Sequence, residues 1–394
     1  MIKESALQAA ATVEQGFKKE LNHNLSLDDR FVKFDANLFR EYQFNSYTSF
    51  RLLAFIQSFL ASNFVLSPSC QFLTCHQNTI SSIVSLVRNP ETFRGYYNHV
   101  ATCGNALCCP LCSPRIMGVR RSEIENAVYR WFHTDPLNTC FMITLTFSHS
   151  LESPLCFVLD KFKQALKLFW EDGRVKRFLQ NSCRVGRITS TEIQYGLKNG
   201  WHPHQHVLIF CRRCLVDLEL LRKVWVSSLM AVGLTALPDV ALQVTSGHDS
   251  AIAGAYLSKI GMEMAFSNLK QGRGNGHYSP MQLLFSAGSG EDWAAHRFSE
   301  LYLSSRGLHS LQWSRGLKAL LQISDVSDRD IASGKADADT QDFLHLVADD
   351  FKHLSASDKA LLRNYCAADD LESAVAILDR LGAVYARDIS DLTK

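Results

Sequence analysis

The 394-residue sequence contains no apolar run long enough to cross a bilayer. Its first residues also lack the charged and apolar regions that mark a secretory signal peptide. From these two absences we expect a cytoplasmic protein with no membrane partner. Apolar residues still make up 46% of the chain, so there is ample material for a folded core.

A strong net charge is absent as well, because the formal charge is only +2. The charges are unevenly distributed, however. From residue 324 onward there are 15 acidic and 8 basic residues, whereas the first 323 residues carry 33 basic and 24 acidic ones. This division is typical of a polyanion-binding body followed by an acidic region, although two ordinary solvated surfaces would give the same count.

Disulfides are not expected in a reducing cytoplasm, so the twelve cysteines need another explanation. Four of them lie within residues 103–112, where a C-x-x-C pair encloses Pro and Leu, a spacing that lets two thiolates meet one tetrahedral Zn²⁺. Cys109 and Cys112 are the first two predicted ligands of a structural zinc, Cys103 or Cys108 could supply a third, and His99 or another cysteine could supply a fourth. Cys70 and Cys75 are expected to be buried thiols, either of which could join the cluster. The alternative is a group of buried thiols without metal.

Two basic segments could contact a nucleic-acid backbone. The first is the helix expected after the cysteines, which carries Arg120 and Arg121 and presents either a solvated or a phosphate-facing surface. The second is the glycine-rich loop of residues 270–278, whose glycines do not fit the spacing of a phosphate-binding loop. It is better interpreted as a cationic strap, in which Lys270 and Arg273 could neutralise a nucleic-acid backbone.

Three histidines alternate at the start of a predicted strand over residues 201–210. Side chains on a strand alternate between its faces, so His202, His204 and His206 project from the same side. Same-face neighbours lie roughly 7 Å apart along a strand, which allows two imidazoles to hold one metal ion. A single buried histidine is usually a core residue, but three at this period favour a metal site.

The strand before these histidines supplies a third ligand. Residues 196–200 contain an Asn-Gly pair and form a predicted hairpin turn, so the strand at 184–195 pairs antiparallel with the histidine strand. If the turn is centred near Lys198, Glu192 lies opposite His204, and Gln194 is the first alternate if the register slips. Two imidazoles and a carboxylate suit Mg²⁺ or Mn²⁺ serving a phosphate substrate, although zinc is also compatible.

Two further segments fit such a site. On a strand at residues 140–147, Thr144 and Thr146 share one face, which either lines a polar site or faces solvent. On a helix predicted at 248–265, Tyr256 and Lys259 lie one turn apart on a single face. A phenol is a weak nucleophile near neutral pH, but a metal-polarised phosphate and a nearby ammonium group would assist its attack.

The order of elements predicts an α+β fold with a central antiparallel sheet and helices packed on it. We divide the chain into a mostly helical region at 1–98, a cysteine-rich segment with a basic helix at 99–133, a catalytic domain with trailing helices at 134–323, and an acidic helical region at 324–394.

These motifs together resemble a known family. A Thr-Leu-Thr strand, a His-Pro-His-x-His strand and a Tyr-x-x-Lys helix, in this order, are similar to the rolling-circle replication initiators of the HUH endonuclease superfamily. The resemblance is greatest to the single-tyrosine Rep proteins of plasmids and mobile elements. The Cys-Pro-Leu-Cys segment, Ser279-Pro280 and the segment at 313–318 extend the likeness over about residues 99–323.

The resemblance implies a role for each matching residue. His204 and His206 would coordinate a divalent ion, His202 would be a DNA-facing or supporting neighbour, and Tyr256 would attack a DNA phosphodiester. The products would be a 5′-phosphotyrosine and a 3′-hydroxyl that primes replication, with Lys259 beside the phosphate. The implied fold is a central antiparallel sheet that accepts single-stranded or hairpin origin DNA. A host helicase or another replication protein is a further expected partner.

The sequence departs from some relatives at one position and leaves two other functions open. Some relatives have a glutamate one turn before the tyrosine, proposed to activate water in the closing step, whereas this chain has Ile252 there. A transposase or mobilisation relaxase would use the same nick-and-join chemistry, though relaxases usually place the tyrosine before the histidines. A zinc-stabilised nucleic-acid-binding protein without catalysis is the other alternative, but it gives the alternating histidines no purpose.

Overall fold

The computed structural model describes residues 46–67, 70–91, 93–148, 151, 153–212, 217–247, 276–334 and 340–393. The predicted helix at 248–265 and most of the basic loop at 270–278 lie outside these ranges. Among the described residues, no helix combines the length and the apolar character that crossing a membrane requires.

The described chain alternates helices with short and long strands. Its strands are β1 (Ile83–Asn89), β2 (Arg94–Asn98), β3 (Thr139–Leu145), β4 (Arg184–Gly196), β5 (Gly200–Cys211), β6 (Leu242–Gly247), β7 (His277–Tyr278), β8 (Leu311–Trp313), β9 (Gln341–Val347) and β10 (Tyr385–Ala386). Its first helices are α3 (Ser46–Asn63), α4 (Gln71–Thr74), α5 (Cys112–Thr134), α6 (Leu155–Glu171), α7 (Gly173–Asn181), α8 (Leu218–Ala231) and α9 (Pro238–Ala241). The later helices are α11 (Pro280–Gly288), α12 (Asp292–Ser304), α13 (Leu317–Leu320), α14 (Asp328–Ser333), α15 (Ala348–His353), α16 (Ala356–Ala368), α17 (Leu371–Leu381) and the 3₁₀ turn η2 (Ile389–Asp391).

A six-stranded antiparallel sheet forms the larger sheet of the fold. Its strands run in the order β6-β3-β5-β4-β7, with β8 also paired to β4. The long hairpin of β4 and β5 lies at its centre, and Gly196 pairs with Gly200 across the turn, as the Asn-Gly sequence predicts. The mixture of helices and antiparallel strands confirms the predicted α+β class.

The two faces of this sheet are covered differently. One face packs apolar side chains of β3 and β5, such as Phe141 and Ile209, against α6, α7 and α8. The other face packs Met142 and Leu208 against α5, which brings Trp131 to the same cluster. Because side chains alternate, the histidines of β5 lie on this second face, beyond the part that α5 covers.

A second, four-stranded sheet has the order β10-β9-β1-β2. The sequence predicts residues 1–98 as mostly helical and residues 324–394 as an acidic helical region, and it does not anticipate these strands or their pairing. In β1, Ile83 pairs with Val347 of β9, so the two predicted regions share one sheet. Val84 and Leu86 of β1 and Leu344 of β9 are fully buried in the same core as α3 and α16.

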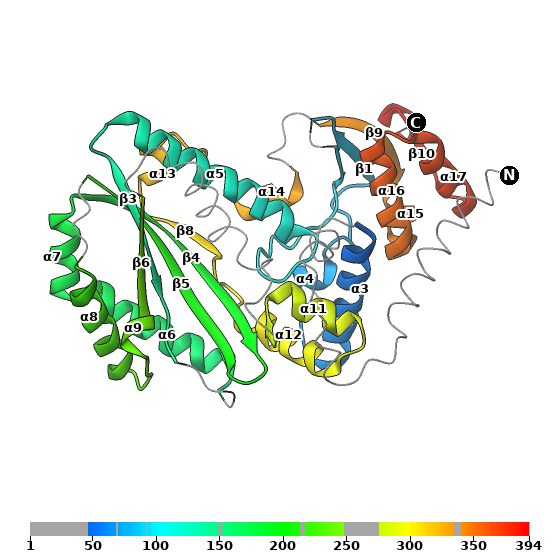
Figure 1. Cartoon of the computed structure of the whole chain (residues 1–394). Coiled ribbons are helices and arrows are strands. Elements are labelled where there is room, and N and C mark those ends of the chain that lie inside the picture. Colours follow the sequence, from blue (N-terminus) through cyan, green and yellow to red (C-terminus); the bar gives the residue numbers. More distant parts are fainter. Residues whose placement is uncertain are drawn as a thin grey trace.

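The two sheets lie in two lobes that the hairpin and α5 connect (Figure 1). At the end of the hairpin, Tyr195 and Trp201 stack edge-to-face at 4.9 Å and join the core that surrounds the second sheet. Tyr195 also lies 6.2 Å from Trp293 of α12. The hairpin that carries the histidines is therefore fixed in both lobes.

Asp172 separates α6 from α7, because its side chain caps α7 by accepting a hydrogen bond from the Arg174 N–H. The stretch at 279–321 contains β8 between α12 and α13, where Trp313 pairs with Ile188 of β4.

Candidate functional site

The central hairpin brings two histidines and a glutamate together. Glu192 of β4 pairs with His204 of β5, the register that the turn predicts. The Nε2 atom of His204 lies 2.7 Å from Glu192 Oε2, and the Nε2 atom of His206 lies 3.2 Å from the same oxygen. Three potential ligand atoms thus meet on one face of the sheet, within 4.8 Å of one another.

Their environment is largely desolvated. Glu192 is 2% exposed and His206 is 6% exposed. A buried carboxylate is costly without compensation, so it needs hydrogen-bond donors or a cation. The second oxygen of Glu192 receives such a donor from the Gln194 amide, at 2.5 Å.

Hydroxyl groups of the neighbouring strand hold the imidazoles in place. Thr144 Oγ1 lies 3.0 Å from His206 Nδ1, which directs the Nε2 atom of that ring toward Glu192. Thr146 Oγ1 lies 2.8 Å from His202 Nε2. Thr144 of β3 and Thr146 just after it therefore line the site, which is the first of the two interpretations that the sequence leaves open.

His202 occupies a different position from the other two histidines. Its ring lies 5.2 Å from that of His204, but its Nε2 atom is held by Thr146 and it is not part of the three-ligand group. The structure therefore places His202 beside the group.

The ligand geometry fits a divalent ion. Two ligands in adjacent octahedral positions, each about 2.1 Å from an ion, lie about 3.0 Å apart. The two Nε2–Oε2 distances of 2.7 and 3.2 Å fall on either side of this value. Imidazole and carboxylate are suitable ligands for Mn²⁺, Mg²⁺ or Zn²⁺, so the group could bind a metal whose identity the geometry leaves open.

A second group consists of four cysteines. The sulfurs of Cys75, Cys103, Cys109 and Cys112 all lie within 4.8 Å of one another. The Cys75 sulfur is 3.8 Å from that of Cys109 and 3.6 Å from that of Cys112. Four sulfurs bound to Zn²⁺ at about 2.3 Å would lie about 3.8 Å apart, so the cluster fits a tetrahedral zinc.

Backbone amides and mutual contacts shape the charge of this cluster. The N–H groups of Asn105 and Cys112 point at the sulfurs of Cys103 and Cys109, each at 3.4 Å. Hydrogen bonds from Cys103 and the other thiols lower the pKa of Cys112 well below its ordinary value, while the contact with Cys109 raises the pKa of Cys103. Because burial and mutual contacts disfavour several thiolates together, a bound cation would be needed to hold four of them.

Cys108, one of the cysteines that the sequence offers as a zinc ligand, is not a member of this group. Cys108 is buried but its sulfur faces Ser305 Oγ at 3.8 Å, and burial raises its pKa to about 12. Cys75 takes the place expected for Cys108. Cys75 lies 28 residues before Cys103, and no metal-binding motif surrounds it. From the sequence, Cys75 is therefore only one of the cysteines that could join the cluster.

The predicted DNA-binding arginines of α5 are engaged within the protein. Arg120 is 8% exposed and forms ion pairs with Glu123 at 2.6 Å and Asp328 at 2.7 Å. Its charge is therefore neutralised internally, unlike that of a surface phosphate contact. Arg121 is half-exposed and pairs with Glu125 at 2.7 Å, one turn along the helix.

The remaining predicted site residues are not described. Tyr256 and Lys259, the predicted nucleophile and its neighbour, lie outside the described residues, as do Lys270, Arg273 and Ile252. The structure therefore positions the part of the predicted site that could bind a metal.

Comparison with known proteins supports a Rep-like protein. The chain is 24% identical over 319 residues to a protein named "Protein rep" from Streptomyces lividans, covering 63% of this chain and 67% of the relative. It is 23% identical over 131 residues to a "Neomycin resistance protein" from Streptomyces cyanogenus, covering 27% of this chain and 30% of that relative. No family model and no solved structure matches the chain.

Proposed function

We propose that this protein is a replication initiator of the HUH endonuclease type, which nicks one strand of origin DNA. The observation that carries the proposal is the Glu192–His204–His206 group, with Glu192 and His206 buried, on the central hairpin of an antiparallel sheet in a chain similar to a Rep protein. A non-catalytic DNA-binding protein would have no need to desolvate a carboxylate between two imidazoles.

In the proposed reaction, the Tyr256 hydroxyl attacks the scissile phosphorus. A bond forms between the tyrosine oxygen and phosphorus, and the bond from phosphorus to the 3′ oxygen breaks. The tyrosine proton passes to solvent, and the departing 3′ oxygen takes up a proton to become the hydroxyl that primes synthesis. The product on the enzyme is a 5′-phosphotyrosine.

Each residue has a distinct role in this scheme. Glu192, His204 and His206 would hold Mg²⁺ or Mn²⁺, which when bound would withdraw charge from the phosphate oxygens. Thr144 Oγ1 lies 3.0 Å from His206 Nδ1 and so keeps the His206 ring oriented toward Glu192. Lys259 would sit beside the phosphate and stabilise its developing charge.

The cysteine cluster would hold a structural Zn²⁺ through Cys75, Cys103, Cys109 and Cys112. In this role it orders the segment that precedes α5 and takes no part in the reaction. A host helicase is the further partner that a replication initiator of this kind would require.

The test uses a randomised single-stranded DNA library, because the origin sequence is unknown. The purified full chain is incubated with the library and Mn²⁺, and DNA that stays attached after protein denaturation is recovered and sequenced. We expect a covalent adduct with one preferred sequence at the protein-linked 5′ end. Tyr256→Phe should abolish the adduct while DNA retention on a filter persists.

Tyr278→Phe is the matched control, since Tyr278 lies on β7 and packs edge-to-face against Trp293 at 5.3 Å. It should form adduct as the parent does. An adduct that survives in Tyr256→Phe would disprove the nucleophile assignment, and the absence of any adduct with intact DNA binding would favour the non-catalytic alternative.

A further inference from the structure

A groove of about 430 Å³ lies on the face of the larger sheet opposite the candidate metal group. Thr191 of β4 pairs with Gln205 of β5 directly beside the pair formed by Glu192 and His204, and because side chains alternate, the two pairs project from opposite faces. The face of Thr191 is the one that packs against α6, α7 and α8, away from α5 (Figure 1). The groove and the metal group therefore share two strands but not a surface.

The groove forms where the apolar core of this face ends. Phe162 and Leu166 of α6 pack in the same core as Val207 of β5. Opposite Val207, the next strand β4 carries the polar Thr189, and β8 places Gln312 beside Thr189 in turn. The lining thus runs from α6 across β4 to β8, and the loop at 307–309 closes its far side.

Three positive groups line this groove. Lys163 and Lys167 lie one turn apart on α6 and are exposed, and Arg187 of β4 is half-buried. None of the described residues that line the groove is Asp or Glu. Within the described part of the chain, none of these three side chains forms an ion pair or donates a hydrogen bond. Their charge is therefore available to a ligand from outside the protein.

Arg187 is held over an aromatic ring. Its guanidinium carbon lies 4.3 Å from the centre of the Trp170 ring, in the last turn of α6. Burial lowers the pKa of this guanidinium, and the positive charge of Arg184 lowers it further. The contact with Trp170 orients the guanidinium and leaves its N–H groups for another partner. Guanidinium planes can stack on nucleic-acid bases as well as bind phosphate.

The floor of the groove offers hydrogen-bonding groups. They belong to Thr189 and Thr191 of β4, Gln205 of β5 and Gln312 of β8. None of these four side chains forms a hydrogen bond to another described residue, and none of their polar atoms is a buried atom without a partner. Their hydroxyl and amide groups are therefore open to the groove, as donors and acceptors of the kind that base edges bind.

We propose that this groove binds a segment of single-stranded DNA, and the choice of DNA as the ligand rests on the proposed function. Lys163, Lys167 and Arg187 would contact backbone phosphates, and the polar floor would contact bases. A volume of 430 Å³ is within the range of small-ligand sites, so a few nucleotides of one strand can enter, whereas a duplex would lie across the rim. Because the metal group lies on the opposite face, the segment bound here would not carry the reacting phosphate.

The first test is fluorescence anisotropy of a labelled oligo(dT) of about 12 nucleotides with the purified full chain. No divalent ion is added, so that nicking does not interfere. The double variant Lys163→Gln plus Lys167→Gln should weaken binding about tenfold or more, because two phosphate contacts are lost. The slope of log affinity against log salt should become shallower by about 1.4, at roughly 0.7 for each contact.

Lys223→Gln is the matched control for this test. Lys223 is an exposed lysine of α8, outside the groove, and its replacement should leave both the affinity and the salt dependence unchanged. Unlabelled polyglutamate tests the other polyanion that a cationic groove could accept. If it displaces the labelled DNA as well as unlabelled oligo(dT) does at equal charge, the ligand is an acidic protein segment and the proposal is wrong.

Lysine footprinting provides a second measurement on the unmodified protein. Saturating oligo(dT) should slow the acetylation of Lys163 and Lys167, read by mass spectrometry, at least about threefold, and should leave Lys223 unchanged. Two results would overturn the proposal: failure of the parent protein to bind oligo(dT), or binding that neither protects these two lysines nor separates the double variant from Lys223→Gln.

Failure of this proposal and failure of the nicking proposal are separate outcomes. A parent protein that forms the covalent adduct while both groove lysines stay unprotected refutes the groove alone. A parent protein that is protected at both lysines but forms no adduct refutes the nicking reaction and retains the groove.

Discussion

At the scale of single residues, Cys75 and Cys108 are both buried cysteines, but only Cys75 belongs to the four-sulfur group. We expect Cys75→Ser to lower bound zinc from about one equivalent to a small fraction and to reduce thermal stability, since a tetrahedral site loses one of its four thiolates. Metal analysis of the purified protein, together with the absorbance of a cobalt-substituted sample, measures both the content and the sulfur ligation.

Cys108→Ser is the matched control for this prediction. Its sulfur faces Ser305, so its replacement should preserve zinc content. If Cys108→Ser loses the metal and Cys75→Ser retains it, the ligand set read from the structure is incorrect.

Two threonines offer a similar comparison at the histidine site. Thr144 contacts His206, whose other nitrogen faces Glu192, whereas Thr146 contacts His202, which lies outside the three-ligand group. Thr144→Val should therefore weaken Mn²⁺ binding about tenfold, the lower end of the usual effect of losing a partner that orients a metal ligand. Thr146→Val should change the Mn²⁺ affinity less than threefold.

Electron paramagnetic resonance of free Mn²⁺ would give both affinities without any need for DNA. Equal affinities for the two variants would mean that the hydrogen bond to His206 does not orient a metal ligand.

At the scale of elements, α16 carries a lysine in an unusual position. Lys359 is 2% exposed, its ammonium group donates to the His76 carbonyl at 3.1 Å, and it lies 4.5 Å from the centre of the Phe351 ring. Burial lowers the pKa of this lysine from 10.5 to about 8. Between about pH 8 and pH 10.5, Lys359 is therefore protonated in the unfolded chain and mostly deprotonated in the folded chain.

The free energy of unfolding contributed by Lys359 should therefore rise with pH from about 8 to about 10.5. A shift of this size corresponds to about 3 kcal/mol. Relative to Lys359→Met, which cannot titrate, the parent protein should gain that stability between pH 7 and pH 10.5 in urea unfolding. Lys352→Met, at a half-exposed lysine paired with Asp349, is the control and should show no such trend. A flat difference for Lys359→Met would mean that its ammonium group is solvated.

The elements also show what the sequence could predict. The β4–β5 register follows from local information, because the Asn199-Gly200 turn and the alternating histidines together place Glu192 opposite His204. The pairing of β1 with β9 joins residues more than 250 positions apart, and no local pattern specifies it. Cys75 was ambiguous for the same reason, since its sulfur reaches the other three only after the chain has folded.

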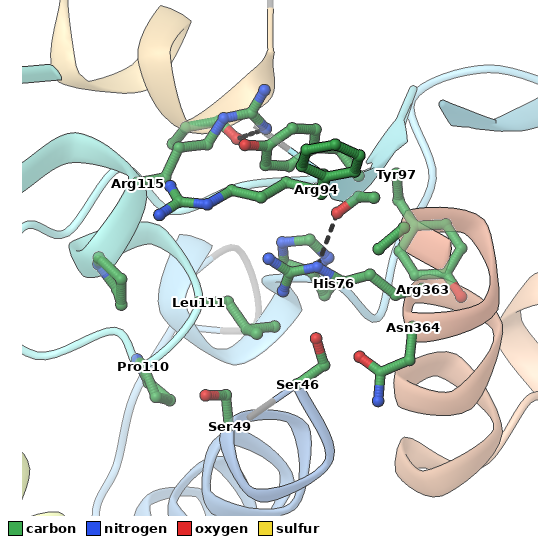
Figure 2. Close-up of a pocket in the computed structure, with 16 residues that line it drawn as sticks. Ser46, Ser49, His76, Arg94, Tyr97, Pro110, Leu111, Arg115, Arg363 and Asn364 are labelled. Atoms are coloured by element: carbon green, nitrogen blue, oxygen red, sulfur yellow. Dashed lines mark hydrogen bonds between the residues drawn. The ribbon is translucent and has the colours of Figure 1, made fainter. Parts of the chain in front are cut away.

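Counting the charges of each segment does not predict which charges are exposed, because the fold determines which of them pair inside the protein. Arg120 contributes to the basic character of α5 in the sequence, yet Asp328, from the acidic region, neutralises it in the structure. Conversely, Arg363 belongs to the acidic region but lines a cavity together with Arg94 and Arg115 of the basic part of the chain (Figure 2). Net charge by segment therefore predicts neither the position nor the sign of the surface that forms.

At the scale of the whole molecule, the second sheet joins an early part of the described chain, β1, to its C-terminal part through β9. β9 lies between β1 and β10, and Leu344, Leu346 and Phe351 are fully buried in the core that also contains α3 and the end of the histidine hairpin. The C-terminal region is thus part of the second lobe, although its acidic composition suggested a separate module.

This arrangement makes a specific prediction about truncation. A chain that ends at residue 340 loses β9, α15, α16 and α17, which leaves one edge of β1 unpaired and exposes the apolar side chains beneath it. We expect this truncated chain to aggregate or to lose its cooperative thermal transition. A chain that ends at residue 387 loses only a surface segment and should melt as the full chain does. Were the shorter chain soluble, with an unchanged melting transition, the C-terminal region would be an independent module after all, and the pairing of β1 with β9 would contribute little to the stability of the fold.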